Sequence, residues 1–187
     1  MDDGGDRRTG AGMRSLDTDY LVVGAGAMGM AFADALVDHA DVHVTLVDRR
    51  TAPGGHWRDA YAFVQLHQAS VFYGVASTVM GDGTIQTSGP ETGLHERAGL
   101  DDILDYFDRV MTHLRGTGRV DFVPQVEHRH DGDGHELVST VTGETTAVRV
   151  RRRVVDAAYL APTIPATTPA PFAVADDARV LPVNDLD

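Results

Sequence analysis

Three glycines near the start of the chain have the spacing that a phosphate-binding turn requires. Gly24, Gly26 and Gly29 form G-x-G-x-x-G between a short apolar run, 20–23, and a largely apolar segment, 27–39. In such a turn the first glycine permits a tight reversal after a strand and the second lets a pyrophosphate approach the backbone. The third lets the following helix pack closely on the sheet. The pattern therefore predicts a strand, a phosphate-binding turn and a helix.

The first turn of this expected helix adds donors of its own. Ala27, Met28 and Gly29 would have N–H groups without partners inside the helix, and these groups and the helix dipole favour an anionic phosphate. Along the same segment, Asp34 and Asp38 are four residues apart, which predicts that both lie on one exposed stripe of an otherwise buried helix.

An acidic residue closes the next apolar run. Residues 42–47 predict a second strand, and Asp48 follows it, nineteen residues after Gly29. A carboxylate at this place accepts hydrogen bonds from a ribose 2′-hydroxyl and repels a 2′-phosphate. Together these elements predict a βαβ unit that binds an adenine dinucleotide. The alternative is an ordinary α/β crossover with an empty loop.

Composition narrows the classes of protein. The chain has 187 residues, 42% of them hydrophobic and 24% charged, which is ordinary for a globular protein with a sizeable core. A formal net charge of −12 argues against a general affinity for nucleic acid or for an anionic membrane surface. The absence of cysteine excludes disulfides, Cys-ligated zinc, iron–sulfur clusters and a redox dithiol. It is compatible with the reducing cytoplasm, where we expect the protein.

The remaining chain divides into segments of different character. Residues 1–18 lack an apolar core and are expected to be a disordered leader, and no later run approaches the roughly 20 apolar residues of a membrane span. Apolar residues spaced three and four apart predict a helix over 100–114. Short apolar runs separated by turn residues predict a three-stranded antiparallel β-meander over 119–153. The proline-rich segment 161–187 is expected to be a linker and tail.

Two polar clusters are better explained by secondary structure than by a site. His128, His130 and His135 flank an expected hairpin turn without a recognisable ligand spacing, so no metal site is predicted. The arginines at 149 and 151–153 alternate along a half-exposed strand, which does not indicate nucleic-acid binding in so acidic a chain. By contrast, Gly54-Gly55-His56-Trp57 has two interpretations: a backbone that passes close to a flat group, or a turn whose tryptophan covers the core.

The order G-A-G-x-x-G, acidic residue, P-G-G-x-W resembles the N-terminal part of flavin-containing monooxygenases and related Baeyer–Villiger monooxygenases. The segment DAYAFVQLHQASVFYGV at 59–75 is similar to a branch of FAD/NAD(P)-binding oxidoreductases close to them. The resemblance implies that the first glycine motif binds FAD, with the three glycines at its pyrophosphate. It also implies Asp48 on the adenosine ribose, Arg49 near the adenine, and Gly55, His56 and Trp57 along the flavin.

Three further features follow from the resemblance. A backbone position of the strand before the meander, here Val126, is implied to contact the adenine. His67 is the candidate for a polar group beside the flavin, the alternative being a packed or solvated histidine. The family's closing strand runs into A-T-G, whose glycine lets the backbone pass close to FAD, whereas this chain has Ala158-Tyr159-Leu160.

The predicted organisation is an α/β chain in which 19–160 form a Rossmann-type FAD-binding domain with a parallel sheet and the meander. A second G-x-G-x-x-G unit for NADPH, which the family has, does not occur here, so the sequence resembles a truncated first half. It is expected to be a fragment, a truncated gene product or a protein that needs a partner chain.

The predicted function is the FAD-binding part of a flavin-dependent, NAD(P)H-using oxidoreductase, monooxygenase-like and acting on a small-molecule substrate. The alternatives are an NAD-dependent dehydrogenase domain and a non-catalytic nucleotide-binding or interaction module. No residue is assigned as a catalytic acid or base from its spacing.

Overall fold

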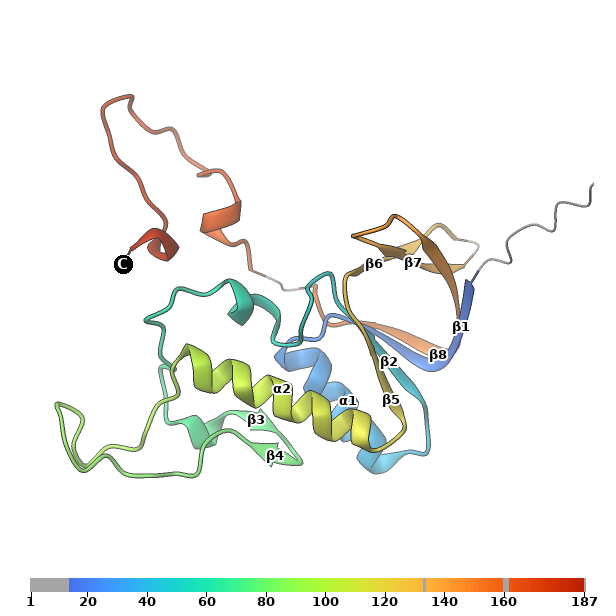
Figure 1. Ribbon diagram of the computed structural model, residues 1–187, viewed down its shortest axis with the longest axis horizontal. Helices are drawn as coiled ribbons and strands as arrows, with labels where there is room; N and C mark the ends of the chain where they lie inside the picture. Colours follow the sequence, from blue (N-terminus) through green and yellow to red (C-terminus); the bar gives the residue numbers. More distant parts are fainter. Residues whose placement is uncertain (1–13, 133, 160–161, 187) are drawn as a thin grey trace, which may run out of the picture.

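A six-stranded sheet with two helices on one face forms the frame of the protein (Figure 1). The computed structural model describes residues 14–132, 134–159 and 162–186. The sheet has the order β5-β2-β1-β8-β7-β6. Its strands are β1 (Arg14–Val23), β2 (Val44–Val47), β5 (Val120–Val123), β6 (Val126–His130), β7 (His135–Ser139) and β8 (Thr145–Asp156). The helices are α1 (Ala27–His39) and α2 (Leu100–Gly116), and β3 (Gly74–Val75) and β4 (Thr78–Val79) form a separate small hairpin.

The predicted βαβ unit is present. β1 and β2 pair in parallel from Tyr20 opposite Val44 to Val23 opposite Val47, and α1 connects them. The strand, however, begins at Arg14, so the expectation of a disordered leader through residue 18 is wrong for its last five residues. They form a strand because the first half of β8 offers a parallel partner for them, from Arg14 opposite Thr146 onward. The rest of the expected leader lies outside the described residues.

The β-meander is displaced from its predicted limits. β5 pairs in parallel with β2 and is therefore the outer strand of the parallel layer. The antiparallel meander consists of β6, β7 and β8 and spans 126–156 instead of 119–153. β8 belongs to both parts, because residues 145–148 pair with β7 while residues 146–156 run parallel to β1. Short apolar runs do not reveal that a strand has two partners.

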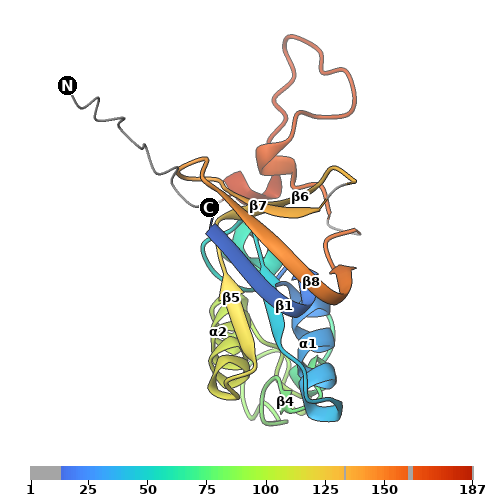
Figure 2. The same cartoon turned by 90° about the vertical axis from the view of Figure 1, so that its right-hand side faces the viewer.

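Alternate residues of β1 pack into two different cores. Val22, with apolar residues of β2 and β5, faces α1 and α2. Leu21 faces the other way, toward Leu137 of β7 and Val148 of β8. Figure 2 shows β6 and β7 in the upper part of the view and the two helices in its lower part. The sheet therefore curls until β6 returns to the end of β2, and Val126 N–H donates to the Asp48 carbonyl oxygen over 3.0 Å.

One residue of the predicted exposed helical stripe is instead a buried anchor. Asp34 of α1 is only 3% exposed, and its carboxylate accepts hydrogen bonds from the N–H of Ser77, over 2.9 Å, and from the Ser77 hydroxyl. Asp38 remains exposed, as expected. A buried carboxylate is tolerated because it receives donors, here from the turn of the β3–β4 hairpin. The spacing of the two aspartates predicts a shared face but not a loop that covers one of them.

The second helix agrees with its sequence pattern and supports the loop that precedes it. The helix predicted over 100–114 is α2, with the six buried residues Ile103, Tyr106, Phe107, Val110, Met111 and Leu114. The Tyr106 hydroxyl accepts a hydrogen bond from the Val75 N–H and donates one to the Thr78 carbonyl oxygen, each over 2.6 Å. Tyr106 thus fixes the β3–β4 hairpin against α2.

The tail has little regular structure where it is described. Between 162 and 186 it contains two single 3₁₀ turns, Pro165–Thr167 and Val183–Asp185, and within that range it contributes no strand to the sheet. Its end is attached to the domain by the Asn184 side-chain amide, which donates to the Asp59 carbonyl oxygen over 2.6 Å. No helix in the described part of the chain is long and apolar enough to cross a membrane.

Candidate functional site

The glycine turn lies at the carboxyl end of β1, where it connects directly to the start of α1. Gly24 has a φ of +106°, which a residue with a side chain rarely adopts, and its N–H donates to the Val47 carbonyl oxygen over 2.8 Å. A Cβ atom on Gly29 would lie 1.9 Å from the Gly24 carbonyl oxygen. The first and third glycines of the motif are therefore required for the turn and for close packing of the helix on it.

The start of α1 presents free donors beside this turn. Gly26 is the N-cap residue and offers no side-chain cap, and the first hydrogen bond of the helix runs from the Met30 N–H to the Gly26 carbonyl oxygen over 3.0 Å. The N–H groups of Ala27, Met28 and Gly29 precede that bond, so helix geometry leaves them unpaired. The Met28 side chain is 74% exposed. This arrangement can receive an anionic phosphate.

The Asp48 side chain is hydrogen-bonded to the glycine turn within the protein itself. The carboxylate is 7% exposed, and its two oxygens accept the N–H groups of Ala25 and Arg50, each over 2.9 Å. One N–H per oxygen leaves further acceptor capacity on each, so the side chain can still accept from a ribose hydroxyl. The two N–H groups offset part of its charge, and hence part of the repulsion expected toward a 2′-phosphate. Fixing the turn is a role that spacing alone does not reveal.

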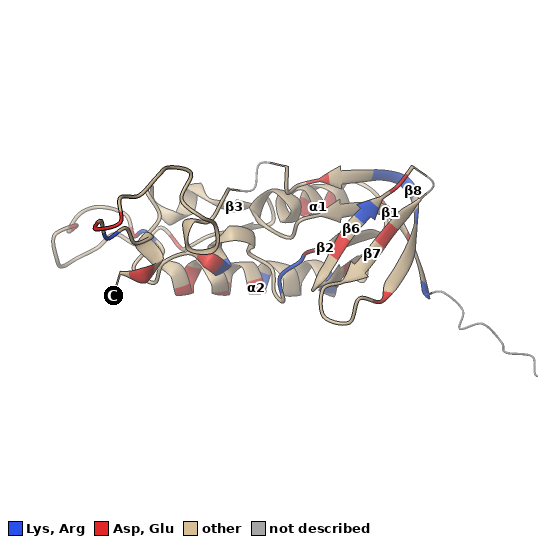
Figure 3. Ribbon diagram, turned by 90° about the horizontal axis from the view of Figure 1, so that it is seen from above, with Lys and Arg blue, Asp and Glu red and all other residues tan. Residues whose placement is uncertain are grey.

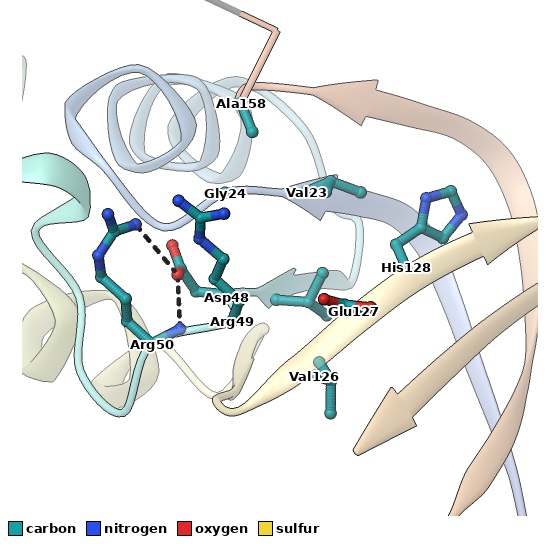
Figure 4. Close-up of a pocket in the computed structure, with 10 residues that line it drawn as sticks. Val23, Gly24, Asp48, Arg49, Arg50, Val126, Glu127, His128 and Ala158 are labelled. Atoms are coloured by element: carbon teal, nitrogen blue, oxygen red, sulfur yellow. Dashed lines mark hydrogen bonds and ion pairs between the residues drawn. The ribbon is translucent and has the colours of Figure 1, made fainter. Parts of the chain in front are cut away.

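Two arginines follow Asp48, and they differ in how they are held. Arg50 places Nη1 3.9 Å from Asp48 Oδ1, and its Nε donates to Asp59 over 3.0 Å. Arg49 is exposed and forms no ion pair or hydrogen bond with other described residues. Figure 4 shows the Arg49 guanidinium extending toward Gly24. Arg49 is thus a cation that remains available to a ligand.

These residues line one pocket with a volume of about 330 Å³. Its lining comes from the ends of β1, β2 and β8 and from the start of β6: Val23, Gly24, Val47, Asp48, Arg49, Arg50, Val126, Glu127, His128 and Ala158. Figure 4 shows Arg49 on one side of this space and His128 on the other. Ligands of open parallel sheets bind at the carboxyl ends of the strands, which is where this pocket lies.

The pocket brings together some of the residues predicted from the sequence. Gly24, Asp48, Arg49 and Val126 line it, whereas the N–H of Val126 is already donated to the Asp48 carbonyl oxygen. Any backbone contact from Val126 to an adenine would therefore use other atoms. Ala158, which stands in the family's A-T-G position, lies 3.2 Å, through its backbone nitrogen, from where a Cβ of Gly24 would be.

Six residues of the lining were not among the predicted site residues: Val23, Val47, Arg50, Glu127, His128 and Ala158. The place of Glu127 and His128 is set by the return of β6 to the end of β2, and this depends on the curl of the whole sheet. One signal was available: His128 follows the implied contact Val126 by two residues, so the two share one face of a strand.

The P-G-G turn packs on the glycine motif itself. The Gly54 N–H donates to the Ala25 carbonyl oxygen over 2.9 Å, and a Cβ on Gly55 would lie 3.0 Å from the Gly26 Cα. The two glycines therefore permit close approach of one loop backbone to another. Trp57 is partly buried and packs against the core under α1. Both observations support the interpretation in which the turn covers the core, and they place it directly beside the phosphate-binding turn.

The two histidines that were predicted as site residues lie outside the pocket. His56 stacks on Trp57, with ring centroids 5.3 Å apart, and burial together with the nearby Arg50 lowers its pKa while Asp59 raises it. His67 is exposed in the loop between Trp57 and the β3–β4 hairpin and does not line the pocket at the ends of β1 and β2. The structure therefore brings neither residue to the adenosine end of the site.

The two polar clusters of the sequence differ in their contacts. No group of three or more histidine or acidic residues in the described chain could hold a metal ion. The arginines of β8 lie beside aspartates of β1: Arg151 Nε is 2.8 Å from Asp19 and Arg149 Nε is 3.7 Å from Asp17. Figure 3 shows the basic stretch of β8 as a blue segment of the ribbon. The interaction with Arg151 is the largest cause that lowers the pKa of Asp19 to about 2.

Comparison with protein families agrees with this geometry. Residues 22–79 match the family described as NAD(P)-binding Rossmann-like domain. Over all 187 residues the chain is 44% identical to Uncharacterized protein Rv2000 of Mycobacterium tuberculosis and to Uncharacterized protein Mb2023 of Mycobacterium bovis. It spans 34% of the length of each of these curated relatives.

Solved structures with the same fold include flavoenzymes. The flavin-containing monooxygenase of Stenotrophomonas maltophilia matches 75% of this chain with a TM-score of 0.54 at 17% identity, and the match covers 38% of that enzyme. The S-allyl-L-cysteine S-oxygenase of Allium sativum matches 75% with a TM-score of 0.53 at 16% identity, over 36% of its length. At these identities the likeness shows the fold. The predicted α/β Rossmann-type architecture, and its resemblance to part of the flavin monooxygenase fold, are confirmed.

Proposed function

We propose that this chain binds FAD and forms the adenosine and pyrophosphate half of the cofactor site in a flavin-dependent, NAD(P)H-using, monooxygenase-like oxidoreductase. The observation that carries the proposal is the pocket at the ends of β1 and β2. It places Asp48 and Arg49 beside the glycine turn, next to the unpaired N–H groups of α1. This combination suits a ribose and two phosphates.

The size of the pocket agrees with half of a dinucleotide. Ligand pockets have volumes of roughly 300–1,000 Å³, and this one, at about 330 Å³, is at the lower limit. The remaining part of a dinucleotide would extend past the pyrophosphate, over the start of α1. There the exposed Met28 and the adjoining Gly54-Gly55 turn form the surface.

Two observations favour a flavin over a nicotinamide as that remaining part. The P-G-G-x-W turn, which resembles the flavin side of the family's site, lies against Gly26, and flavin-containing monooxygenases are among the structures with this fold. A bound flavin would supply electron transfer from NADPH and reaction with oxygen. The chain's own residues would bind and orient the cofactor: glycines and helix N–H groups at the phosphates, Asp48 at the ribose.

Retention of cofactor by the purified chain tests this proposal. The chain is mixed separately with FAD, FMN, NAD⁺ and NADP⁺, unbound nucleotide is removed, and bound nucleotide is measured by absorbance. We expect nearly one FAD per chain and little FMN, because FMN lacks the adenosine that the pocket would hold. Binding of NAD⁺ or NADP⁺ in preference to FAD would refute the flavin assignment and favour a nicotinamide site.

A matched pair of variants shows whether any retained FAD occupies this site. Arg49→Gln removes the free cation in the pocket, whereas Arg115→Gln removes an exposed arginine at the end of α2, outside it. Affinity for FAD should fall in the first variant and stay at the wild-type value in the second. Equal affinities in both would place the bound flavin elsewhere. If no dinucleotide binds to the wild-type chain, the interaction module is the better hypothesis.

A further inference from the structure

The end of the pocket opposite Arg49 is formed by a histidine whose ring is fixed by a second histidine. His128 of β6 lines the pocket, and its Nε2 lies 3.0 Å from Nδ1 of His135 on β7. The two rings stack with centroids 5.2 Å apart and planes 27° from parallel, and the His130 ring also stacks on His135, with centroids 4.5 Å apart. His128 is therefore oriented before any ligand arrives.

The pocket changes in character from one end to the other. Asp48, Arg49 and Arg50 stand near the glycine turn, where phosphates and ribose are expected. Toward β6 the walls include the apolar side chains Val23, Val47 and Val126, followed by Glu127 and the imidazole of His128. A flat, uncharged, aromatic group fits this second end, because apolar walls favour its burial and an imidazole can pack on it.

The surroundings of His128 also favour its uncharged form, which suits contact with an uncharged nucleobase. Burial lowers its pKa, and His135 and His130 lower it further, while Asp156 at the end of β8 raises it. Burial and the two neighbouring histidines thus favour the uncharged form of the ring. Of the two nitrogens, Nε2 is engaged by His135, so Nδ1 stays available to a ligand. A ring that is already oriented loses little conformational entropy when a base packs against it.

We propose that His128 is the residue that recognises the adenine base of the bound nucleotide, and that His135 positions its ring. The inference rests on the proposed dinucleotide function and deepens it: the resemblance implies a backbone contact at Val126 of β6, and His128 adds a side-chain contact from the same strand. Neither histidine is an expected contact from the sequence, where both belong to a hairpin without a recognisable ligand spacing.

The test separates contact with the base from support of the fold. His128→Gln removes the aromatic ring, and His113→Gln is the control: the same change at an exposed histidine of α2, outside the pocket lining and on a different element from His128, His130 and His135. Affinities for FAD and AMP are measured by calorimetry, and that for ribose 5-phosphate, which has no base, by competition with FAD. Stacking of a base on an aromatic side chain contributes about 1–3 kcal/mol.

We expect His128→Gln to weaken binding of FAD and AMP roughly 5- to 150-fold and to leave binding of ribose 5-phosphate unchanged. His113→Gln should change none of the three affinities. Undiminished AMP binding in His128→Gln would overturn the proposal. So would an equal loss for AMP and ribose 5-phosphate, which would indicate a structural role. In both cases binding of FAD by the wild-type chain would leave the proposed function intact. If the wild-type chain binds neither FAD nor AMP, the proposed function fails, and the inference fails with it.

Discussion

Replacing Gly29 with alanine should separate the glycine turn from the helix that packs on it. The added Cβ would lie 1.9 Å from the Gly24 carbonyl oxygen, and ordinary contact begins at 3.4 Å, so the two backbones would have to separate by about 1.5 Å. The obstacle is a main-chain atom and cannot rotate away, as the end of a side chain would. Overpacking of this kind costs about 1–3 kcal/mol, and we expect the upper end.

The effect can be measured on stability and on binding at once. Unfolding in urea should show a lower midpoint at an unchanged slope, and a loss of about 3 kcal/mol corresponds to a decrease in melting temperature of roughly 6–12 °C for a chain of this size. FAD affinity should fall as well, because the displaced helix carries the unpaired N–H groups of Ala27 and Met28 away from the turn.

Gly116→Ala is the matched control for this prediction. Gly116 is the last residue of α2, it is exposed, and no atom lies within 4 Å of the position of an added Cβ. The same substitution should therefore stay within about 0.5 kcal/mol of the wild type and leave FAD binding unchanged. The reasoning would be refuted if Gly29→Ala were as stable as Gly116→Ala and bound FAD equally well.

Three further changes should act on stability. Asp34→Asn should lower the free energy of unfolding in urea by about 1–3 kcal/mol. The reason is that an amide cannot replace the carboxylate, whose two oxygens accept from the N–H and the hydroxyl of Ser77. Unchanged stability would contradict the role of Asp34 as a buried anchor. Tyr106→Phe should cost a similar amount, about 1–3 kcal/mol, and speed amide exchange in the β3–β4 hairpin ahead of the sheet. The pKa values of His128 and His135 are lowered from 6.5, mainly by burial. Below pH 6.5 the unfolded chain therefore binds more protons than the folded chain. Stability should consequently fall as the pH decreases from about 6.5. As the pH decreases below about 6.5, the urea midpoint should decrease less in a variant with both histidines changed to glutamine. An equal dependence of the midpoint on pH in the variant and the wild type would argue against the lowered pKa values.

The sequence by itself determined the elements that depend on local chemistry. The spacing of Gly24, Gly26 and Gly29 predicts the turn, because only glycine adopts the backbone of the first position and leaves room at the third. The 3.6-residue periodicity over 100–114 predicts α2, since one apolar face must pack on the core. The position of Asp48 at the end of a strand follows from the length of the βαβ unit.

Tertiary structure alone decided what those residues contact. Asp34 is buried because the hairpin after it in the chain covers α1, and Asp48 accepts the Ala25 N–H because β2 ends beside the glycine turn. His128 enters the pocket because β8 pairs with both β1 and β7 and so turns the meander back over β2. Local periodicity predicts which face of a strand or helix a residue occupies. The pairing of distant strands determines what lies opposite that face, because it depends on the whole curled sheet.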